Sequence, residues 1–245
     1  MRAYVFTDTA LTGEAGRFVW LEMNTEKKES AAFSKKNGVG ALPTYFIVSP
    51  DSESVLLRRV GGATTGQLKN ILDAGERAMS GGQLLPADGL ALEADRLYGS
   101  GDYKSSAPLY DRALQQAPAG WPARERTVES LLFALSMSDS NEAAARLALR
   151  EIDGVRGRAA SANVAASGLD AAASLPEDSP GRPELLQKLE AEASAIVTNV
   201  PPDAPGDDIS GVYIALISAR EALKDSAGAH DMAVRSVRSG QASEH

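Results

Sequence analysis

The feature that most constrains this chain is an abrupt change in residue texture along its length. Seven of the 13 aromatic residues lie within the first 50 positions, among β-branched residues that favour strands. Residues 141–174 contain no aromatic residue, and 12 of these 34 positions are alanine, the residue with the highest helix propensity. The sequence therefore predicts a mixed region of strands and helices at its start and a helical region after it.

Short strands and helices alternate in the first 80 residues. The pattern predicts, in chain order, a buried strand at 17–22, a helix at 29–37, strands at 44–48 and 54–60, and a helix at 65–79. Pro50-Asp51 supplies a turn between the last two strands, which indicates an antiparallel hairpin. Gly75 falls on the apolar stripe of the last helix, where glycine costs about 1 kcal/mol relative to alanine.

The string Gly-Val-x-x-Leu-Pro-Thr-aromatic at 38–45 resembles the second half of a thioredoxin domain. In thioredoxin-like proteins the proline of this motif forms a cis peptide bond beside the redox cysteines, and Pro43 matches that position. Leu42 and Thr44 flank it, and Gly61 would lie in the adjoining backbone groove. The resemblance implies that these four residues bind an extended peptide through outward-facing backbone groups. The alternative is that Pro43 only turns the chain into its strand.

The chain departs from the thioredoxin-like pattern at its beginning. In the family, a segment like residues 1–8 follows the Cys-x-x-Cys pair inside the helix that carries it, whereas this chain has no cysteine. The family's first strand, first helix and second strand have no counterpart, so the strands at 17–22 and 44–48 would lack their shared neighbour. Either those two strands pair directly, or one edge of the sheet stays open. We expect Met1 to be an internal methionine of a longer gene product.

Everything after Gly82 has the pattern of helices separated by Gly, Pro, Asp and Ser. The pair at 88–118 resembles a tetratricopeptide (TPR) helix hairpin, in which Tyr110 fills the gap between the helices. Pro108 departs from that pattern and requires the second helix to start late. Trp121 is expected to cap this hairpin, with an exposed anchor as the alternative. Further helices are predicted at 121–138, 142–152, 159–173, 180–199 and 208–224.

Composition excludes most familiar catalytic chemistry. Without cysteine the chain has no disulfides, thiolate metal ligands or dithiol redox reactions. His230 and His245 are the only histidines, so histidine catalysis and a zinc site are not expected. The sequence contains no phosphate-binding glycine loop and no serine-nucleophile motif. We therefore expect no cofactor and no metal.

Charge and hydropathy limit the classes of partner. Residues 1–80 carry a net charge of +1 and the remainder −9, and an acidic protein of this kind repels the phosphates of nucleic acid. No apolar run is long enough for a membrane span, and the chain does not open with a signal-peptide pattern. The acidic pairs Asp207-Asp208 and Glu190/Glu192 are explained by helix dipoles and solvated faces. A protein or peptide is the expected partner, with no nucleic acid, membrane or metal.

These patterns predict an α+β protein in two parts. An incomplete thioredoxin-like α/β domain is expected at 1–80 and an all-α domain of TPR-like hairpins at 83–225, followed by a frayed tail at 226–245. The first hypothesis is a redox-incompetent, thioredoxin-like fragment of a bacterial thiol–disulfide oxidoreductase. The alternative is a non-catalytic interaction scaffold in which the TPR-like helices bind a partner. The expected location is cytoplasmic if Met1 is the true start, and periplasmic or exported if an upstream segment is missing.

Overall fold

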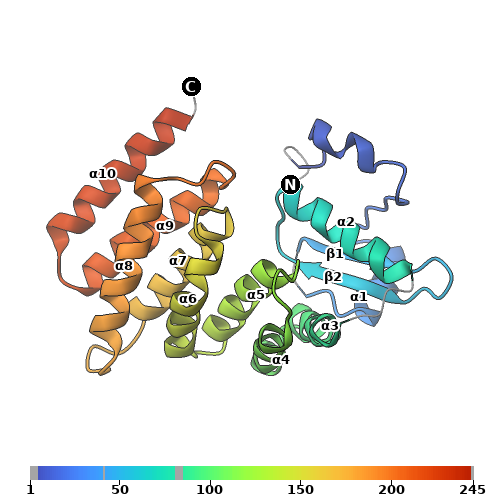
Figure 1. Cartoon of the computed structure of the whole chain (residues 1–245), viewed down its shortest axis with the longest axis horizontal. Coiled ribbons are helices and arrows are strands. Elements are labelled where there is room, and N and C mark those ends of the chain that lie inside the picture. Colours follow the sequence, from blue (N-terminus) through green and yellow to red (C-terminus); the bar gives the residue numbers. More distant parts are fainter. Residues whose placement is uncertain (1–4, 41, 81–84, 244–245) are drawn as a thin grey trace. The chain divides into compact units, whose positions relative to one another are not determined.

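The structure, a computed structural model, describes residues 5–40, 42–80 and 85–243, with side chains described as far as residue 239. It contains helices and a two-stranded antiparallel sheet, which is the predicted α+β composition (Figure 1). The chain divides into two compact units, residues 1–123 and 124–245. The domain boundary predicted between 80 and 83 falls largely on residues 81–84, which lie outside the described residues, and stays a prediction.

Within its described residues, the first unit contains the sheet, a short 3-10 helix and four α-helices. In chain order these are η1 (Thr9–Glu14), α1 (Lys28–Lys36), β1 (Thr44–Val48), β2 (Val55–Val60), α2 (Thr65–Met79), α3 (Pro86–Gly99) and α4 (Tyr103–Gln116). Strands β1 and β2 and the Thr-capped helix α2 therefore form where the sequence predicts them.

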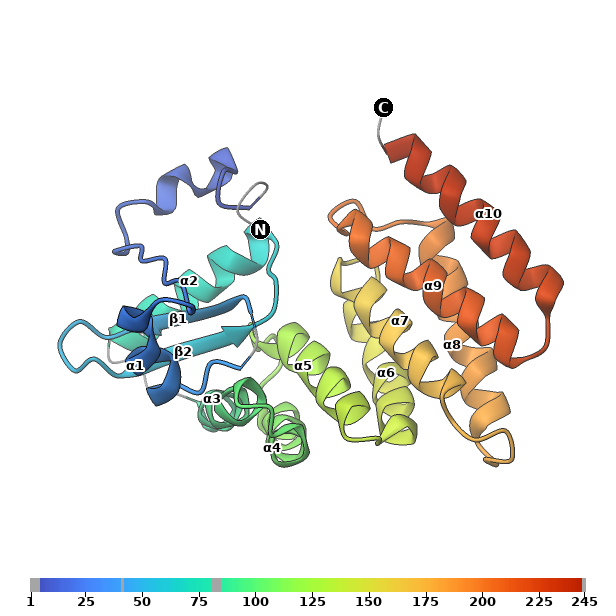
Figure 2. The same cartoon turned by 180° about the vertical axis from the view of Figure 1, so that it is seen from behind.

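The sheet is a hairpin with a helix on each face. Strands β1 and β2 pair antiparallel, as the Pro50-Asp51 turn predicts, and Figure 2 shows α1 and α2 on opposite sides of them. On the α2 face, a Cβ added at Gly75 would lie 2.2 Å from Cδ1 of Ile47, so the close packing of helix on strand requires glycine there. On the α1 face, Phe33 meets Phe46 edge to face, with ring centroids 5.2 Å apart.

Helix α2 begins with a capping box and supplies half of the buried core residues beside the sheet. The Thr64 hydroxyl accepts the N–H of Gln67 at 3.2 Å, and the Gln67 side chain accepts the N–H of Thr64 at 2.9 Å. Its apolar stripe then faces the strands. The buried core of this layer is formed by Leu11, Ile47, Ala63, Leu68, Ile71 and Leu72.

The prediction of a strand at 17–22 is wrong, because the structure has no strand there. Val19 is 88% exposed and Leu21 82%, although Phe18 still packs against the core of the first unit. Among the described residues the sheet consists of β1 and β2 alone, and the segment pairs with neither strand. Direct pairing with β1, one of the two expected outcomes, does not occur. Apolar and β-branched residues form a strand only where a partner strand is present.

Helices α3 and α4 pack together as a hairpin around a buried tyrosine. Tyr110 is fully buried, and its hydroxyl donates to Oδ1 of Asp95, itself 1% exposed, at 2.7 Å. Trp121 is also buried, and its Nε1 donates to Oδ1 of Asp88 at 2.7 Å, near the start of α3. Trp121 therefore caps the hairpin and is not an exposed anchor.

Pro108 lies inside helix α4, which corrects the expectation that this helix starts late. The helix begins at Tyr103 because Asp102 caps it, accepting the N–H of Ser105 at 3.1 Å. Pro108 is exposed, so the carbonyl of Lys104, which loses its helical hydrogen bond, can face water. The proline is tolerated on the outer face of the helix.

The second unit consists, over its described residues, of six α-helices. In chain order these are α5 (Arg124–Met137), α6 (Asn141–Val155), α7 (Ala160–Ala173), α8 (Arg182–Thr198), α9 (Gly206–Ala222) and α10 (Ser226–Ser243). Helix α7 packs against α5, α6, α8 and α9. Small residues make this possible: a Cβ added at Gly168 of α7 would lie 2.3 Å from the Cβ of Ala148 on α6. Small residues are required where helices approach this closely.

The tail expected to be frayed from Ser226 is instead helix α10, which extends to Ser243. It packs against α9 and buries Ala229 and Met232, which are 6% and 3% exposed. Two small or flexible apolar residues form too sparse a stripe to be recognised by periodicity, and packing on α9 supplies the missing stabilisation. His230 on this helix is exposed, and His245 lies outside the described residues.

Candidate functional site

The four residues implicated by the thioredoxin resemblance lie together at one end of the sheet. Pro43 follows Leu42 through a cis peptide bond, and Thr44 begins β1. The N–H of Gly61, just after β2, donates to the carbonyl oxygen of Pro43 at 2.9 Å. The side chain of Leu42 is 67% exposed, and the position of an added Cβ on Gly61 is open space. We call this site, formed by Leu42, Pro43, Thr44 and Gly61, the proline loop.

Strand β1 presents main-chain groups beside the proline loop. The hydrogen bond from Gly61 to Pro43 makes these two residues a hydrogen-bonded pair of the antiparallel ladder. Because such pairs alternate along a strand, Tyr45 and Ile47 direct their N–H and C=O groups to β2, and Phe46 directs its groups to the opposite edge. In the described part of the chain no other strand pairs with that edge. In β-strand addition, an extended peptide pairs with a sheet edge that no strand of the protein occupies.

Two buried arginines of β2 brace the surroundings of the proline loop from opposite faces of the sheet. Arg59 is 7% exposed, and its Nε and Nη2 donate to the carbonyl oxygen of Gly62 at 3.2 and 2.9 Å, which fixes the turn after Gly61. Arg58 is 2% exposed and donates from Nη1 to the Asn37 carbonyl and from Nη2 to the Gly38 carbonyl.

Burial lowers the pKa of the Arg58 guanidinium, and the nearby Asp95 carboxylate opposes that fall. The guanidinium also lies 5.1 Å from the centroid of the Phe46 ring, a cation–π distance. The positive charge of Arg58 is therefore stabilised by the carbonyls of Asn37 and Gly38, by the face of the Phe46 ring and by the Asp95 carboxylate. Sequence reasoning missed both arginines. The signal was present: two adjacent arginines in an apolar strand point to opposite faces, so at least one must be buried.

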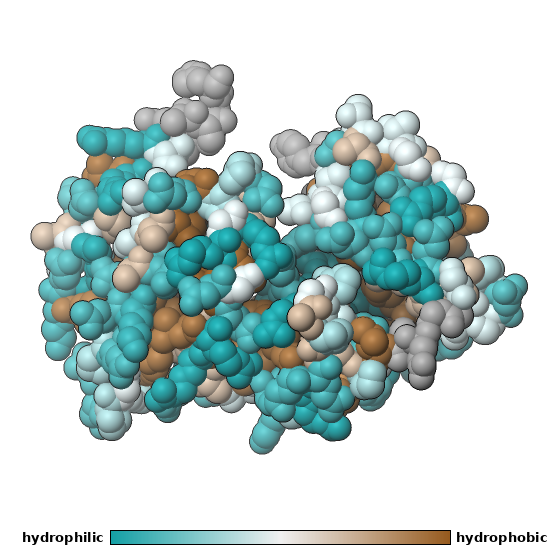
Figure 3. All heavy atoms as spheres, in the orientation of Figure 1, coloured by the Kyte–Doolittle hydropathy of each residue, from teal (hydrophilic) through white to brown (hydrophobic). Residues whose placement is uncertain are grey.

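Aromatic residues from the start of the chain lie against β1. Phe6 is 6.3 Å, centroid to centroid, from both Tyr45 and Trp20. Phe6 and Trp20 are each 43% exposed, whereas the Tyr45 hydroxyl is buried and has no hydrogen-bond partner in the described residues. Burial raises the pKa of Tyr45, against the attraction of Arg59. On the face shown in Figure 3, hydrophobic side chains form separate patches among hydrophilic ones.

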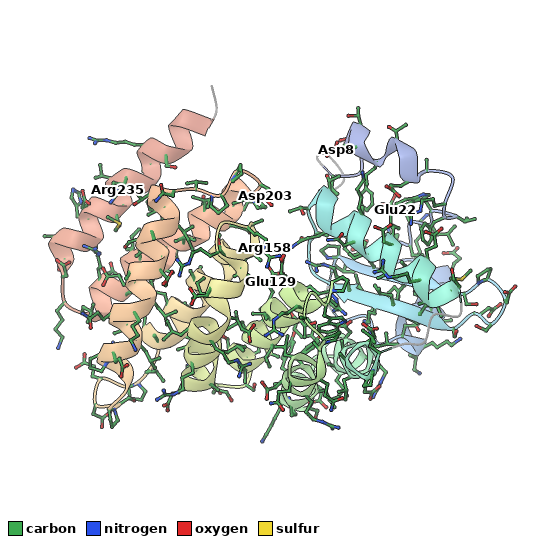
Figure 4. All side chains as sticks on the ribbon, viewed as in Figure 1. Asp8, Glu22, Glu129, Arg158, Asp203 and Arg235 are labelled. Carbon is green, nitrogen blue, oxygen red and sulfur yellow. The ribbon has the colours of Figure 1, made fainter. Side chains whose placement is uncertain are left out.

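A hollow of about 450 Å³ lies at residues 22–30, and its lining includes Glu22, Met23 and Lys27. Glu22 is labelled in Figure 4, which also shows Asp8 beside the start of α2, where the Thr65 hydroxyl donates to the Asp8 carboxylate at 2.7 Å. No residue of the proline loop lines this hollow. Its mixed polar lining offers no set of catalytic groups.

The second unit has a separate polar cluster between helices. Asn163 of α7 donates from Nδ2 to Oε1 of Glu129 and to Oδ2 of Asp208, both at 3.3 Å. Figure 4 labels Glu129 and also Arg158, which forms an ion pair with Glu125. Burial and the adjacent Asp207 raise the pKa of Asp208. The contacts of Asn163 join α7 to α5 and α9. The acidic pair Asp207-Asp208 lies in the first turn of α9, as predicted.

The described residues contain neither a metal-binding cluster of side chains nor a membrane-spanning helix. No group of three or more His, Cys, Asp or Glu side chains there is arranged to hold a metal ion. No helix in the same residues is long and apolar enough to cross a membrane. The chain matches no family model, no curated protein and no solved structure.

Proposed function

We propose that this chain is a thioredoxin-like, non-catalytic protein that binds an extended peptide at the proline loop and the adjoining edge of β1. The observation that carries the proposal is the position of Leu42, whose exposed side chain lies just before β1, next to the edge of β1 that faces away from β2. A peptide added there would gain main-chain hydrogen bonds from Phe46 and an apolar contact from Leu42. Thiol–disulfide exchange is not part of the proposal, because the chain has no cysteine.

The braced surroundings support a binding role for the loop. Arg59 holds the Gly62 carbonyl and Arg58 holds the carbonyls of Asn37 and Gly38, so main chain on both sides of the loop is fixed. A binding loop that is already ordered loses less conformational entropy when a peptide binds. The thioredoxin resemblance gives the same four residues the role of holding a substrate peptide.

A second candidate function is the interaction scaffold formed by the TPR-like helices. The observation that favours it is an exposed apolar pair on α5, where Phe133 is 45% and Met137 54% exposed. These residues are four apart and therefore share one helix face. Exposed apolar side chains on a helix are a common contact for a partner.

Substitutions of Leu42 and Phe133 by aspartate, with a control at a third exposed position, separate the two candidate functions. Linear peptides selected on the wild-type protein from a phage-displayed library would be labelled and titrated by fluorescence anisotropy. We expect Leu42→Asp to weaken binding about tenfold or more, because it places a charge at an apolar contact. Leu223→Asp, at another exposed leucine (46%), is the control and should bind as the wild type does.

Unchanged binding by Leu42→Asp would overturn the proline-loop proposal. If Phe133→Asp abolished binding while Leu42→Asp did not, the helical scaffold would be the function. Circular dichroism of each variant would confirm that it remains folded.

A further inference from the structure

The segment that leads into the proline loop is attached to the end of helix α3. The N–H of Gly40 donates to the carbonyl oxygen of Gly99, the last residue of α3, at 2.6 Å. A Cβ added at Gly40 would lie 2.5 Å from that same oxygen. The two main chains therefore approach as closely as glycine permits, two residues before Leu42.

Arg58 completes this attachment. Its guanidinium donates to the carbonyls of Asn37 at 2.6 Å and Gly38 at 2.7 Å, so it holds the chain between α1 and the loop. A Cβ added at Gly99 would lie 1.9 Å from Nη2 of Arg58. Gly99 thus leaves the space that the guanidinium occupies.

The hairpin beneath this contact is itself held by buried polar groups. Tyr110 of α4 donates to Asp95 of α3, and both residues are almost completely buried. Asp95 also attracts the Arg58 guanidinium. Strand β2 and helix α3 pack directly against each other. The end of α3 is therefore a rigid support for the segment 37–40.

We propose that the α3–α4 hairpin positions the proline loop through Gly99 and Arg58, so that peptide affinity depends on the end of α3. This inference rests on the proposed function and assigns the hairpin, which resembles a TPR unit, a role in that site. Gly99 and Arg58 are positioning residues, because both act through residues 37–40. Displacing the guanidinium releases two carbonyls and loosens the contact between Gly40 and Gly99.

The experiment compares two substitutions in the same helix. Gly99→Ala introduces a methyl group at the position of Nη2 of Arg58, whereas Gly89→Ala is the control, because nothing lies within 4 Å of an added Cβ there. Amide hydrogen exchange followed by NMR would report on Gly40, and the exchange of Leu68 in α2 would report on the fold. Peptides selected on the wild type would report on affinity.

For Gly99→Ala we expect exchange of the Gly40 amide and the peptide dissociation constant each to rise about tenfold, with Leu68 unchanged. Arg58→Lys cannot bond both carbonyls, so it should also raise the exchange rate of the Gly40 amide and the peptide dissociation constant. This variant replaces Gly99→Ala in the experiment if Gly99→Ala does not fold. Unchanged Gly40 exchange, or equal acceleration at Leu68, would overturn the positioning role. If no peptide binds the wild type, the proposed function fails, and the exchange of Gly40 still decides whether the hairpin orders the loop.

Discussion

At the scale of single residues, the hydrogen bond between Tyr110 and Asp95 joins two almost completely buried side chains of the first unit. A tyrosine with no exposure donates at 2.7 Å to a carboxylate that is 1% exposed. Removing the hydroxyl deprives a buried carboxylate of a donor, so we expect Tyr110→Phe to lower the free energy of unfolding by about 1–3 kcal/mol. Urea denaturation measures this. Tyr213→Phe is the control, a buried tyrosine with no side-chain hydrogen bond in the described structure, and an equal loss there would contradict the explanation.

A second residue-scale prediction concerns the carboxyl of Asp208. Burial, with help from Asp207, raises its pKa above the ordinary value of 3.8, against the hydrogen bond from Asn163. The folded protein therefore binds this proton more tightly than the unfolded chain, and the contribution to stability falls as the pH rises through the folded-state pKa. Asp208→Asn removes the buried charge and keeps an acceptor for Asn163. At neutral pH we expect it to raise the free energy of unfolding, because the desolvation cost of the carboxylate is then removed.

The same comparison at a pH well below 3.8 should show no such gain, because Asp208 is then protonated in both the folded and the unfolded state. Urea denaturation at the two pH values measures the difference. Asp170→Asn, at an exposed position of α7, is the matched control. A loss of stability in Asp208→Asn at neutral pH would show that the favourable interaction of the carboxylate with the start of α9 outweighs its burial.

At the scale of elements, helix α4 is predicted to be weakened by its own proline. Pro108 stands inside α4 and deprives the Lys104 carbonyl of its helical donor. Pro108→Ala restores that hydrogen bond, so we expect the free energy of unfolding to rise by about 1 kcal/mol or more. Pro183→Ala is the control, because Pro183 lies in the first turn of α8, where proline costs nothing. A loss of stability on Pro108→Ala would mean that the packing of Tyr110 depends on the proline.

The elements also show how far local pattern determines this fold. Strand β1 and helix α2 have the predicted bounds, because residue preference, turn residues and a Thr cap all favour the same structure there. Residues 17–22 have an equally good strand pattern and form no strand, since a strand needs a neighbour that no local pattern supplies. Helix α10 is the converse, because contact with α9 stabilises a sequence with little periodicity of its own.

The candidate site likewise has one part that could be predicted from the sequence and another part that could not. The four residues of the proline loop could be placed together from a motif, because the hairpin register that joins Pro43 to Gly61 follows from one turn. The support from Gly99 and Arg58 could not, because it depends on how α3 packs against β2, far apart in sequence. Gly75 shows the same limit. The sequence shows that glycine at this position lowers helix propensity. Only the structure shows why glycine is needed there, which is the close contact with Ile47.

At the scale of the whole molecule, the absence of cysteine decides between binding and exchange. Disulfide exchange begins with the attack of a thiolate on a disulfide, and this chain has no sulfur that can form a thiolate. We therefore expect it not to accelerate the reduction of a disulfide-bridged peptide by dithiothreitol. The contacts proposed for the proline loop are main-chain groups and an apolar side chain, so a selected peptide and its version with serine for cysteine should have equal dissociation constants by anisotropy. Faster reduction, or a preference for the cysteine-bearing peptide, would contradict a binding protein that works without redox chemistry.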